Sequence, residues 1–305
     1  MKVTIEQQQY RHKILKAENL ASEGKYLHAI QVFSSLIEEH PEEKESYYKL
    51  VAVYERTDNI DAAHKLLLKL LEENPEDEEL RIYLSHFLLR NEKWDETLET
   101  LEFLTPEDQP SVAFFNGFAY FKLGNYQLAE RSLKKFIKLD KKSEFIPDAY
   151  VFLTKTCVHL EKYESALKYI KIAETFFAHD PEIQLLFAVV YTNLDMNQHA
   201  LERINKTLKF KRKPVEVYKW AGIIFYKNNE LDKAKNFFNK YLKTSESDSA
   251  EIYFFLGEIA KLEGDLTRAD EFVEISTKLV NKFLLTDVEQ ISNNILTLNT
   301  ATSDG

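Results

Sequence analysis

Three phenylalanines are spaced so that they share one side of a helix. Phe114, Phe118 and Phe121 stand at i, i+4 and i+7, which places their rings on a single stripe of a helical surface. Each ring that a partner buries contributes roughly 1.5 to 3 kcal/mol before ordering costs. The chemistry that this stripe predicts is the binding of an apolar or aromatic segment.

A second group of residues suited to binding is a basic run near residue 210. Five cations fall within eight residues, namely Lys206, Lys209, Lys211, Arg212 and Lys213. Cations near the end of a helix complement the helix dipole, which gives the run a purely structural explanation. A surface that binds an acidic partner or a phosphate explains it equally.

The chain carries none of the common catalytic or cofactor motifs. It has no Gly-rich phosphate loop, Gly-Lys-Ser/Thr pair, His-Glu-x-x-His or Cys-x-x-Cys, which mark many nucleotide, zinc and redox sites. Its eight histidines are scattered, and its single cysteine, Cys157, excludes an internal disulfide. We predict that the protein is not an enzyme and has no cofactor, metal or small-molecule substrate.

Charge is unevenly distributed along the sequence. The formal net charge is -10, yet residues 1–110 hold 24 Asp and Glu against 13 Lys and Arg, whereas residues 111–305 hold 26 against 27. An acidic first third repels phosphates, so nucleic acid is an unfavourable partner. The sequence has no apolar run of membrane-spanning length and no signal-like start. We expect a soluble, cytoplasmic protein without membrane insertion.

The elements that must present these residues are helices, since seven Gly and seven Pro in 305 residues are few. A small residue recurs at intervals of 32 to 37 residues, at Ala29, Ala63, Thr97, Ala129, Ala166, Ala200, Ala234 and Ala269. Twelve residues before each lies another short or β-branched side chain, at Ala17, Val51, Ser85, Gly117, Thr154, Ala188, Gly222 and Gly257. Short side chains suit positions where two antiparallel helices cross closely.

A turn residue separates the two helices of each unit. The turn positions are Gly24, Asp58, Glu92, Gly124, Glu161, Asp195, Asn229 and Gly264. Gly, Asn and Asp tolerate the left-handed conformation that ends a helix, whereas Glu92 and Glu161 suit it less well. The period and the small-residue pattern resemble the tetratricopeptide repeat (TPR) over residues 10–282.

The resemblance predicts an all-α fold, a right-handed α-solenoid of about eight antiparallel helix pairs. The predicted units are 10–43, 44–77, 78–109, 110–146, 147–180, 181–214, 215–249 and 250–282, after a lead-in at 1–9. The short interval near 103–110 predicts a truncated second helix in the third unit, and the long interval inserts residues around 141–147. A capping helix at 283–298 and a disordered tail at 299–305 complete the prediction.

In this family the first helix of each unit lines a concave groove, so the resemblance also implies which side chains face a partner. The predicted partner-binding residues are Tyr48, Tyr83, Phe114, Phe118, Phe121, Lys122, Lys155, Trp220, Tyr226 and Phe254. We expect Phe118 and Phe121 to be exposed, whereas Phe115, Phe152 and Phe255 can equally pack against the next repeat.

The function implied by the resemblance is that of a non-catalytic scaffold or adaptor. It would bind an apolar or aromatic peptide or helix of another protein, in complex assembly or chaperoning. A permanent structural subunit of a larger complex fits the same sequence. An RNA-processing repeat protein is the weakest alternative, because it needs a basic concave face that the acidic first third lacks.

Overall fold

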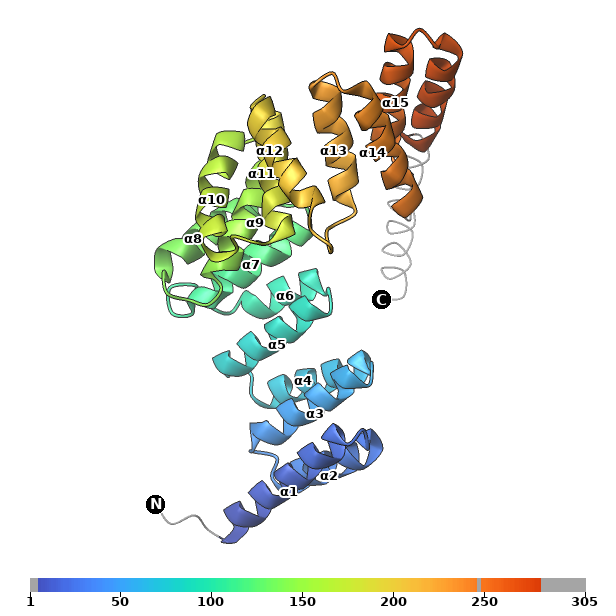
Figure 1. Ribbon diagram of the computed structural model, residues 1–305. Helices are drawn as coiled ribbons and strands as arrows, with labels where there is room; N and C mark the ends of the chain where they lie inside the picture. Colours follow the sequence, from blue (N-terminus) through green and yellow to red (C-terminus); the bar gives the residue numbers. More distant parts are fainter. Residues whose placement is uncertain (1–4, 246–247, 281–305) are drawn as a thin grey trace, which may run out of the picture. The chain divides into compact units, whose positions relative to one another are not determined.

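A computed structural model describes residues 5–245 and 248–280 (Figure 1). All regular structure in these two ranges is helical, without a strand in either, so the all-α prediction is confirmed. The chain divides into two compact units, residues 1–141 and 142–305. The division falls at the start of the segment where the repeat interval lengthens.

The helices follow one another as pairs joined by short turns, and the helices of a pair pack together. The first unit contains α1 Ile5–Ser22, α2 Tyr26–Glu39, α3 Lys44–Arg56, α4 Ile60–Glu73, α5 Glu78–Arg90, α6 Trp94–Leu101, α7 Pro110–Lys122 and α8 Tyr126–Leu139. The second unit contains α9 Ile146–His159, α10 Tyr163–Phe176, α11 Pro181–Asn193, α12 Asn197–Leu208, α13 Glu216–Lys227, α14 Leu231–Thr244, α15 Ala250–Leu262 and a helix at 266–280.

Two of the expected features can be compared with these helices, and a third cannot. Helix α1 begins at Ile5, within the lead-in at 1–9 that is expected to precede the first repeat. The second helix of the third pair, α6, has only 8 residues, so the predicted truncation is confirmed. The capping helix expected at 283–298 and the tail at 299–305 lie outside the described residues.

All eight predicted turn positions adopt a left-handed backbone. The φ angles run from 54° at Asp195 to 83° at Gly264, and Glu92 and Glu161 have φ of 58° and 57°. A residue with positive φ just after a helix lets the chain reverse into the next helix. The turn prediction is therefore confirmed, including the two glutamates, where the requirement for a reversal outweighs the modest cost of a left-handed non-glycine residue.

The small residues lie where the two helices of a pair cross. A Cβ atom added at Gly222 in α13 would fall 2.4 Å from ring atoms of Phe238 in α14. One added at Gly117 in α7 would fall 2.7 Å from Cγ of Leu133 in α8. These distances are too short for any side chain, so glycine allows the close approach of the two helices.

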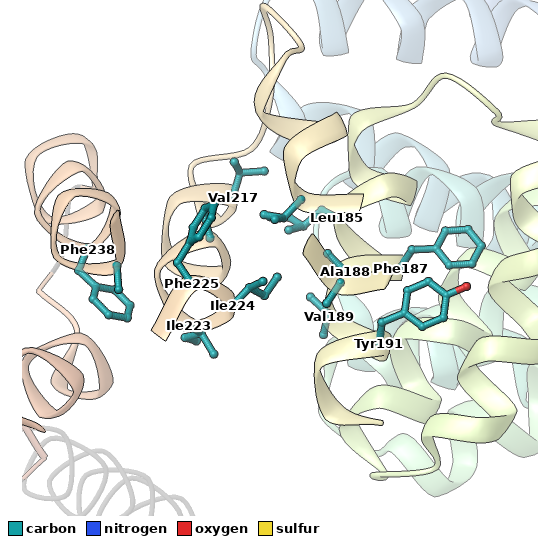
Figure 2. Close-up of a cluster of buried hydrophobic side chains, with 14 of the residues drawn as sticks. Leu185, Phe187, Ala188, Val189, Tyr191, Val217, Ile223, Ile224, Phe225 and Phe238 are labelled. Atoms are coloured by element: carbon teal, nitrogen blue, oxygen red, sulfur yellow. The ribbon is translucent and has the colours of Figure 1, made fainter. Parts of the chain in front are cut away.

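Each unit has its own apolar core. In the first unit, Phe33, Leu36, Leu67, Leu84 and Phe87 are almost fully buried between successive helix pairs. In the second unit the buried side chains form one cluster from α9 to α15, part of which is shown in Figure 2. The residues labelled there are Leu185, Phe187, Ala188, Val189, Tyr191, Val217, Ile223, Ile224, Phe225 and Phe238.

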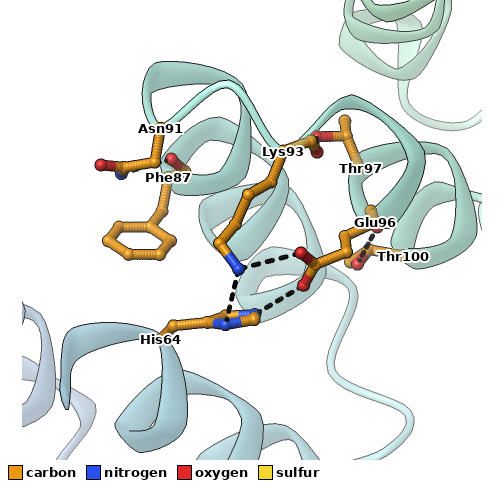
Figure 3. A network of polar contacts seen from close by, with 7 residues as sticks. All are labelled: His64, Phe87, Asn91, Lys93, Glu96, Thr97 and Thr100. Atoms are coloured by element: carbon orange, nitrogen blue, oxygen red, sulfur yellow. Dashed lines mark hydrogen bonds and ion pairs between the residues drawn. The ribbon is translucent and has the colours of Figure 1, made fainter. Parts of the chain in front are cut away.

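A polar network joins α4 to α6 in the first unit (Figure 3). The Lys93 ammonium lies 3.3 Å from His64 Nδ1 and donates to Glu96 Oε1 at 2.9 Å. Since lysine can only donate, the neutral His64 ring carries its proton on Nε2. That atom lies 3.1 Å from Glu96 Oε2 but lacks a partner in hydrogen-bond geometry. Burial, assisted by the charge of Lys93, lowers the pKa of His64.

The second unit has a different network, between α10, α11 and α12. The Arg203 guanidinium donates to Glu174 and, at 2.8 Å, to Gln184, and it lies 3.9 Å from the ring centre of Phe187. The Gln184 amide in turn donates to Glu174 Oε1 at 3.3 Å. Burial alone would raise the pKa of Glu174, but the hydrogen bonds from Arg203 and Gln184 outweigh it and lower that pKa.

Candidate functional site

Two tyrosines meet on the first helices of the first unit. The rings of Tyr48 in α3 and Tyr83 in α5 stack with centroids 4.1 Å apart and an interplanar angle of 30°. Both side chains are half-buried. Burial, together with the charge of Glu55, raises the pKa of Tyr83 to about 12, so this hydroxyl is neutral at physiological pH.

Ion pairs between successive first helices flank the two rings. The Lys49 ammonium of α3 bonds to Glu18 of α1, and this hydrogen bond raises the pKa of Lys49. The Arg90 guanidinium of α5 contacts Glu55 of α3, with Nη2 lying 2.9 Å from Oε1 and 3.2 Å from Oε2. We call the surface formed by Glu18, Tyr48, Lys49, Glu55, Tyr83 and Arg90 the first-helix face.

The contacts continue toward α7 through an imidazole. His86, an exposed residue of α5, stacks on Phe115 of α7 with centroids 5.8 Å apart and an interplanar angle of 5°. Its Nδ1 lies 3.1 Å from Nη1 of Arg90. Polar and aromatic contacts therefore link α1 to α3, α3 to α5, and α5 to α7.

The stripe expected in α7 is only partly a surface feature. Phe114 is 7% exposed and packs on Phe136 of α8 at 5.3 Å, so the expectation that it is an exposed anchor is wrong. Its position, three residues before Gly117, faces the second helix of its own pair, which buries the ring. The i, i+4, i+7 spacing gives a shared side of the helix but not the exposure of that side.

The other residues of this stripe are half-buried. Phe118 meets the Trp94 ring edge-on at 5.7 Å, and the Lys122 ammonium lies 5.6 Å from the centre of the Phe118 ring. Phe121 lies 5.8 Å from Tyr126. These rings pack within the first unit and present only part of their surface.

In the second unit, the predicted residues are divided among several contacts. The Lys155 ammonium pairs with Glu182 at 2.5 Å and lies 5.2 Å from the centre of the Phe152 ring. Trp220 is half-buried against the core of this unit. Lys155 and Trp220 therefore have structural partners of their own.

One further group of rings meets at α13 and α15. Phe255 lies 5.2 Å from Tyr226 and 5.8 Å from Phe254, and Phe254 is 50% exposed. Nearby inner positions hold the buried aliphatic side chains of Leu185, Val189 and Ile223 (Figure 2). A continuous row of exposed rings is therefore not found in the described part of the second unit.

The basic run lies at the end of α12 and in the loop that follows. Lys206, Lys209, Lys211 and Arg212 are exposed. Lys213 is half-buried, and its ammonium donates to the carbonyl of Phe210. The run is a surface patch with one member that ties down its own loop.

Sequence reasoning found the two tyrosines and missed the ion pairs beside them. The paired residues Glu18 and Lys49 are 31 positions apart, and Glu55 and Arg90 are 35 apart. Opposite charges separated by about one repeat length are the signal that identifies such pairs, because successive first helices lie side by side.

The sequence of these helix pairs is similar to that of a known protein family. The tetratricopeptide-repeat family profile matches residues 20–80 and 117–143. A TPR repeat-containing protein of Methanocaldococcus jannaschii, MJ1428, is 24% identical over 218 residues. The chain belongs to the tetratricopeptide-repeat superfamily. The match covers 69% of this chain and 35% of that relative, so the chain spans about a third of the relative's length.

Solved structures share the TPR fold with this chain. A tetratricopeptide repeat protein from Parabacteroides merdae has a TM-score of 0.58 at 16% identity, covering 88% of this chain and 99% of that one. The APC/C hetero-tetramer Cut9-Hcn1 has a TM-score of 0.58 at 16% identity, covering 86% of this chain and 52% of that one. PilW, a type IV pilus biogenesis factor, has a TM-score of 0.53 at 19% identity over 65% of this chain and 92% of that one. Such distant likeness establishes a fold and leaves function to the site itself.

TPR proteins in general mediate protein–protein interaction without catalysis. Within residues 5–245 and 248–280, no three His, Cys, Asp or Glu side chains group together as metal ligands. In the same ranges no helix has the length and apolar character needed to cross a bilayer.

Proposed function

We propose that the first-helix face binds a segment of another protein and that the chain works as an interaction scaffold or adaptor. The observation that carries this proposal is the half-buried Tyr48 and Tyr83 stack on helices that the Glu18–Lys49 and Glu55–Arg90 ion pairs also join. Tyrosine combines a large apolar ring with a hydroxyl that can bond a partner, and it is enriched among the residues that dominate binding energy.

The ion pairs give the face a fixed shape before a partner arrives. Each pair joins neighbouring first helices and restrains long side chains that would otherwise be ordered on binding, at a cost of about 0.5 to 1.5 kcal/mol each. Rings that are already stacked also lose little further freedom. A preformed face of this kind suits an apolar or aromatic side chain on a helix or an extended peptide of the partner.

The experiment compares three tagged baits in affinity capture from lysate of the source cells. They are the wild-type protein, the first-helix variant Tyr48→Ser/Tyr83→Ser, and the matched control Tyr150→Ser/Tyr169→Ser. The control pair is also half-buried, with rings 6.3 Å apart, but lies on α9 and α10 of the second unit. Circular dichroism and melting curves first establish that the three baits are folded alike.

We expect the first-helix variant to lose at least one partner by about tenfold or more, which corresponds to roughly 1.4 kcal/mol. Wild type and control should retain that partner equally. A photo-cross-linking residue placed at Ala52, one turn after Tyr48 on α3, should then form a covalent adduct with the same partner. Equal recovery by all three baits would exclude binding through this face.

The same material separates an adaptor from a permanent subunit. An adaptor gives a population of free chain in gel filtration of the lysate and a complex that dissociates on dilution. A permanent subunit gives a single high-mass peak with a fixed ratio of chains, because obligate interfaces are larger and more apolar.

A further inference from the structure

Six exposed cations gather at one end of the second unit. Lys206 lies in the last turn of α12, and Lys209, Lys211 and Arg212 follow in the loop. Lys240 and Lys243 lie in the last turns of α14. We call the surface formed by Lys206, Lys209, Lys211, Arg212, Lys240 and Lys243 the basic edge.

The basic edge is contiguous because the repeat brings its two halves together. Lys206 and Lys240 stand six residues after the small residues Ala200 and Ala234. They therefore occupy the same place on the second helix of neighbouring pairs. The Lys240 ammonium lies 4.5 Å from the ring centre of Tyr218, in the first turn of α13, directly after the basic loop. The ends of α12 and α14 thus both lie beside the start of α13.

None of the six cations of the basic edge has an ion pair among the described residues. Three lysines on first helices of this unit are paired, Lys155 with Glu182, Lys219 with Glu251 and Lys227 with Asp195. By contrast, no described carboxylate makes an ion pair with a member of the basic edge. The charge of Lys206 helps to lower the pKa of Glu174, but that carboxylate already accepts hydrogen bonds from Arg203 and Gln184.

The helix dipole explains only part of this arrangement. It favours Lys206 and Lys243, which lie in last turns, by about 0.3 to 1 kcal/mol each. It does not explain Lys211 and Arg212, which lie beyond the end of α12. Like charges held close together without counter-charges are mutually repulsive, and an anionic ligand relieves that repulsion.

We propose that the basic edge binds an acidic segment of a partner polypeptide. A polypeptide fits better than a nucleic acid because the surroundings of the edge are acidic. Residues 142–305 hold 24 Asp and Glu against 21 Lys and Arg, and the exposed Glu202 and Glu216 border the basic edge along the chain. A long phosphate backbone would be repelled on leaving the edge. A short acidic peptide of about ten residues spans about 33 Å when extended, enough to cross helix pairs packed about 10 Å apart.

The test is fluorescence anisotropy on the full chain with two labelled probes. One probe is an oligo-glutamate peptide of about ten residues, and the other is an oligothymidine of similar charge, both in salt of about 100 mM. The edge variant carries Lys206→Glu, Lys209→Glu, Lys240→Glu and Lys243→Glu. The control variant has the same net charge, with exposed lysines reversed elsewhere at Lys65→Glu, Lys168→Glu, Lys171→Glu and Lys261→Glu.

We expect the oligo-glutamate peptide to bind wild type, with a Kd that rises more than about tenfold in the edge variant and less than about threefold in the control. The Tyr48→Ser/Tyr83→Ser variant should bind the peptide as wild type does, because the basic edge is independent of the first-helix face. No binding by wild type, or equal losses in the two charge-reversed variants, would overturn the proposal. Oligothymidine binding as tight as that of the peptide, and lost in the edge variant, would reassign the edge to nucleic acid.

Discussion

The two units are alike inside their helix pairs but differ at several of their helix ends. Gly117 meets Leu133 in the first unit just as Gly222 meets Phe238 in the second. Nine residues after the second small residue, however, α2 and α4 of the first unit carry glutamates, whereas α12 and α14 of the second unit carry lysines: Glu38, Glu72, Lys209 and Lys243. The crossing of the helices fixes the residue at the first kind of position and leaves the second free. Differences in function are therefore to be sought at the ends and faces of the pairs.

The polar networks of the two units also differ, in how completely their members are hydrogen-bonded. Arg203 in the second unit bonds to both of its polar partners, Glu174 and Gln184. In the first unit, Nε2 of His64 lacks a hydrogen-bond partner although the ring is largely buried. A fully bonded network adds stability, whereas an incomplete one leaves a group whose protonation matters. Because Glu174 keeps its charge until its own lowered pKa is reached, this contrast predicts that the network of the first unit is the first to weaken as the pH falls.

The largest effect is expected from a methyl group at the shared crossing. In Gly222→Ala the new Cβ meets the fully buried ring of Phe238, and such overpacking costs about 1 to 3 kcal/mol. The gain in helix propensity returns at most about 1 kcal/mol. Because a 2.4 Å approach to the ring places the cost at the upper end of that range, we expect a net loss of about 2 kcal/mol, measured by urea denaturation followed by circular dichroism. Gly117→Ala should act in the same direction in the first unit.

Gly257→Ala is the matched control for both substitutions. Its Cβ would lie 3.4 Å from the nearest atoms, the carbonyl oxygen of Ala269 and a methyl of Val273. Helix propensity should then prevail, and stability should rise by up to about 1 kcal/mol. A stabilising Gly222→Ala would show that the crossing in the second unit can open, and that the likeness of the two interiors is only apparent.

The next largest effect tests the bonded network of the second unit. Arg203→Met keeps apolar contact with Phe187 but removes the donor to the buried Gln184 Oε1 and leaves Glu174 with only the Gln184 amide as donor. We expect a loss of about 1 to 2 kcal/mol in chemical denaturation. Arg203→Met/Glu174→Gln should lose less than the sum of its two single variants, because the partners act together. Strict additivity would mean that the network contributes nothing as a unit.

The helix pairs could be predicted from sequence because the constraints that shape them are local. A small residue at a crossing, such as Gly222, and a turn residue such as Asp58 follow directly from the backbone geometry of the pair. Even Glu92 and Glu161 follow the pattern, since the reversal of the chain requires a positive φ there whatever the side chain. These positions recur in every helix pair, so the assignment of each repeat is supported by the others.

The candidate site was less predictable because exposure depends on packing beyond one helix. The spacing of Phe114, Phe118 and Phe121 indicates a common side, but the ring of Phe136 buries Phe114. The Tyr48 and Tyr83 positions were identified, yet their stacking depends on how α3 lies against α5. The His64 network is harder still to predict from sequence, since no motif identifies contact between a lysine and a histidine 29 positions apart.

A smaller effect, dependent on pH, is expected from His64. Its pKa is lowered in the folded state, so the unfolded chain binds the proton more readily below the usual histidine value of about 6.5. Stability is therefore complete above that pH and falls as the pH drops below it. His64→Gln should flatten this loss in melting curves recorded across the range. Lys93→Met should weaken it, because the neighbouring cation is removed; an unchanged acid slope in both variants would exclude His64 as its source.

The smallest effect concerns the charge at the ends of α4 and α14. Glu72 lies in the last turn of α4 and Lys243 in the last turn of α14, both exposed. The carbonyl end of a helix dipole favours a cation, so Glu72→Lys should stabilise and Lys243→Glu should destabilise, each by about 0.3 to 0.5 kcal/mol after solvent screening. The two shifts should shrink together in high salt, as denaturation midpoints can show. If Glu72→Lys destabilises instead, the glutamate at the end of α4 serves the fold of the first unit. If it stabilises, local stability does not explain that glutamate. Binding of a basic partner at the ends of α2 and α4 would then be the next explanation to test.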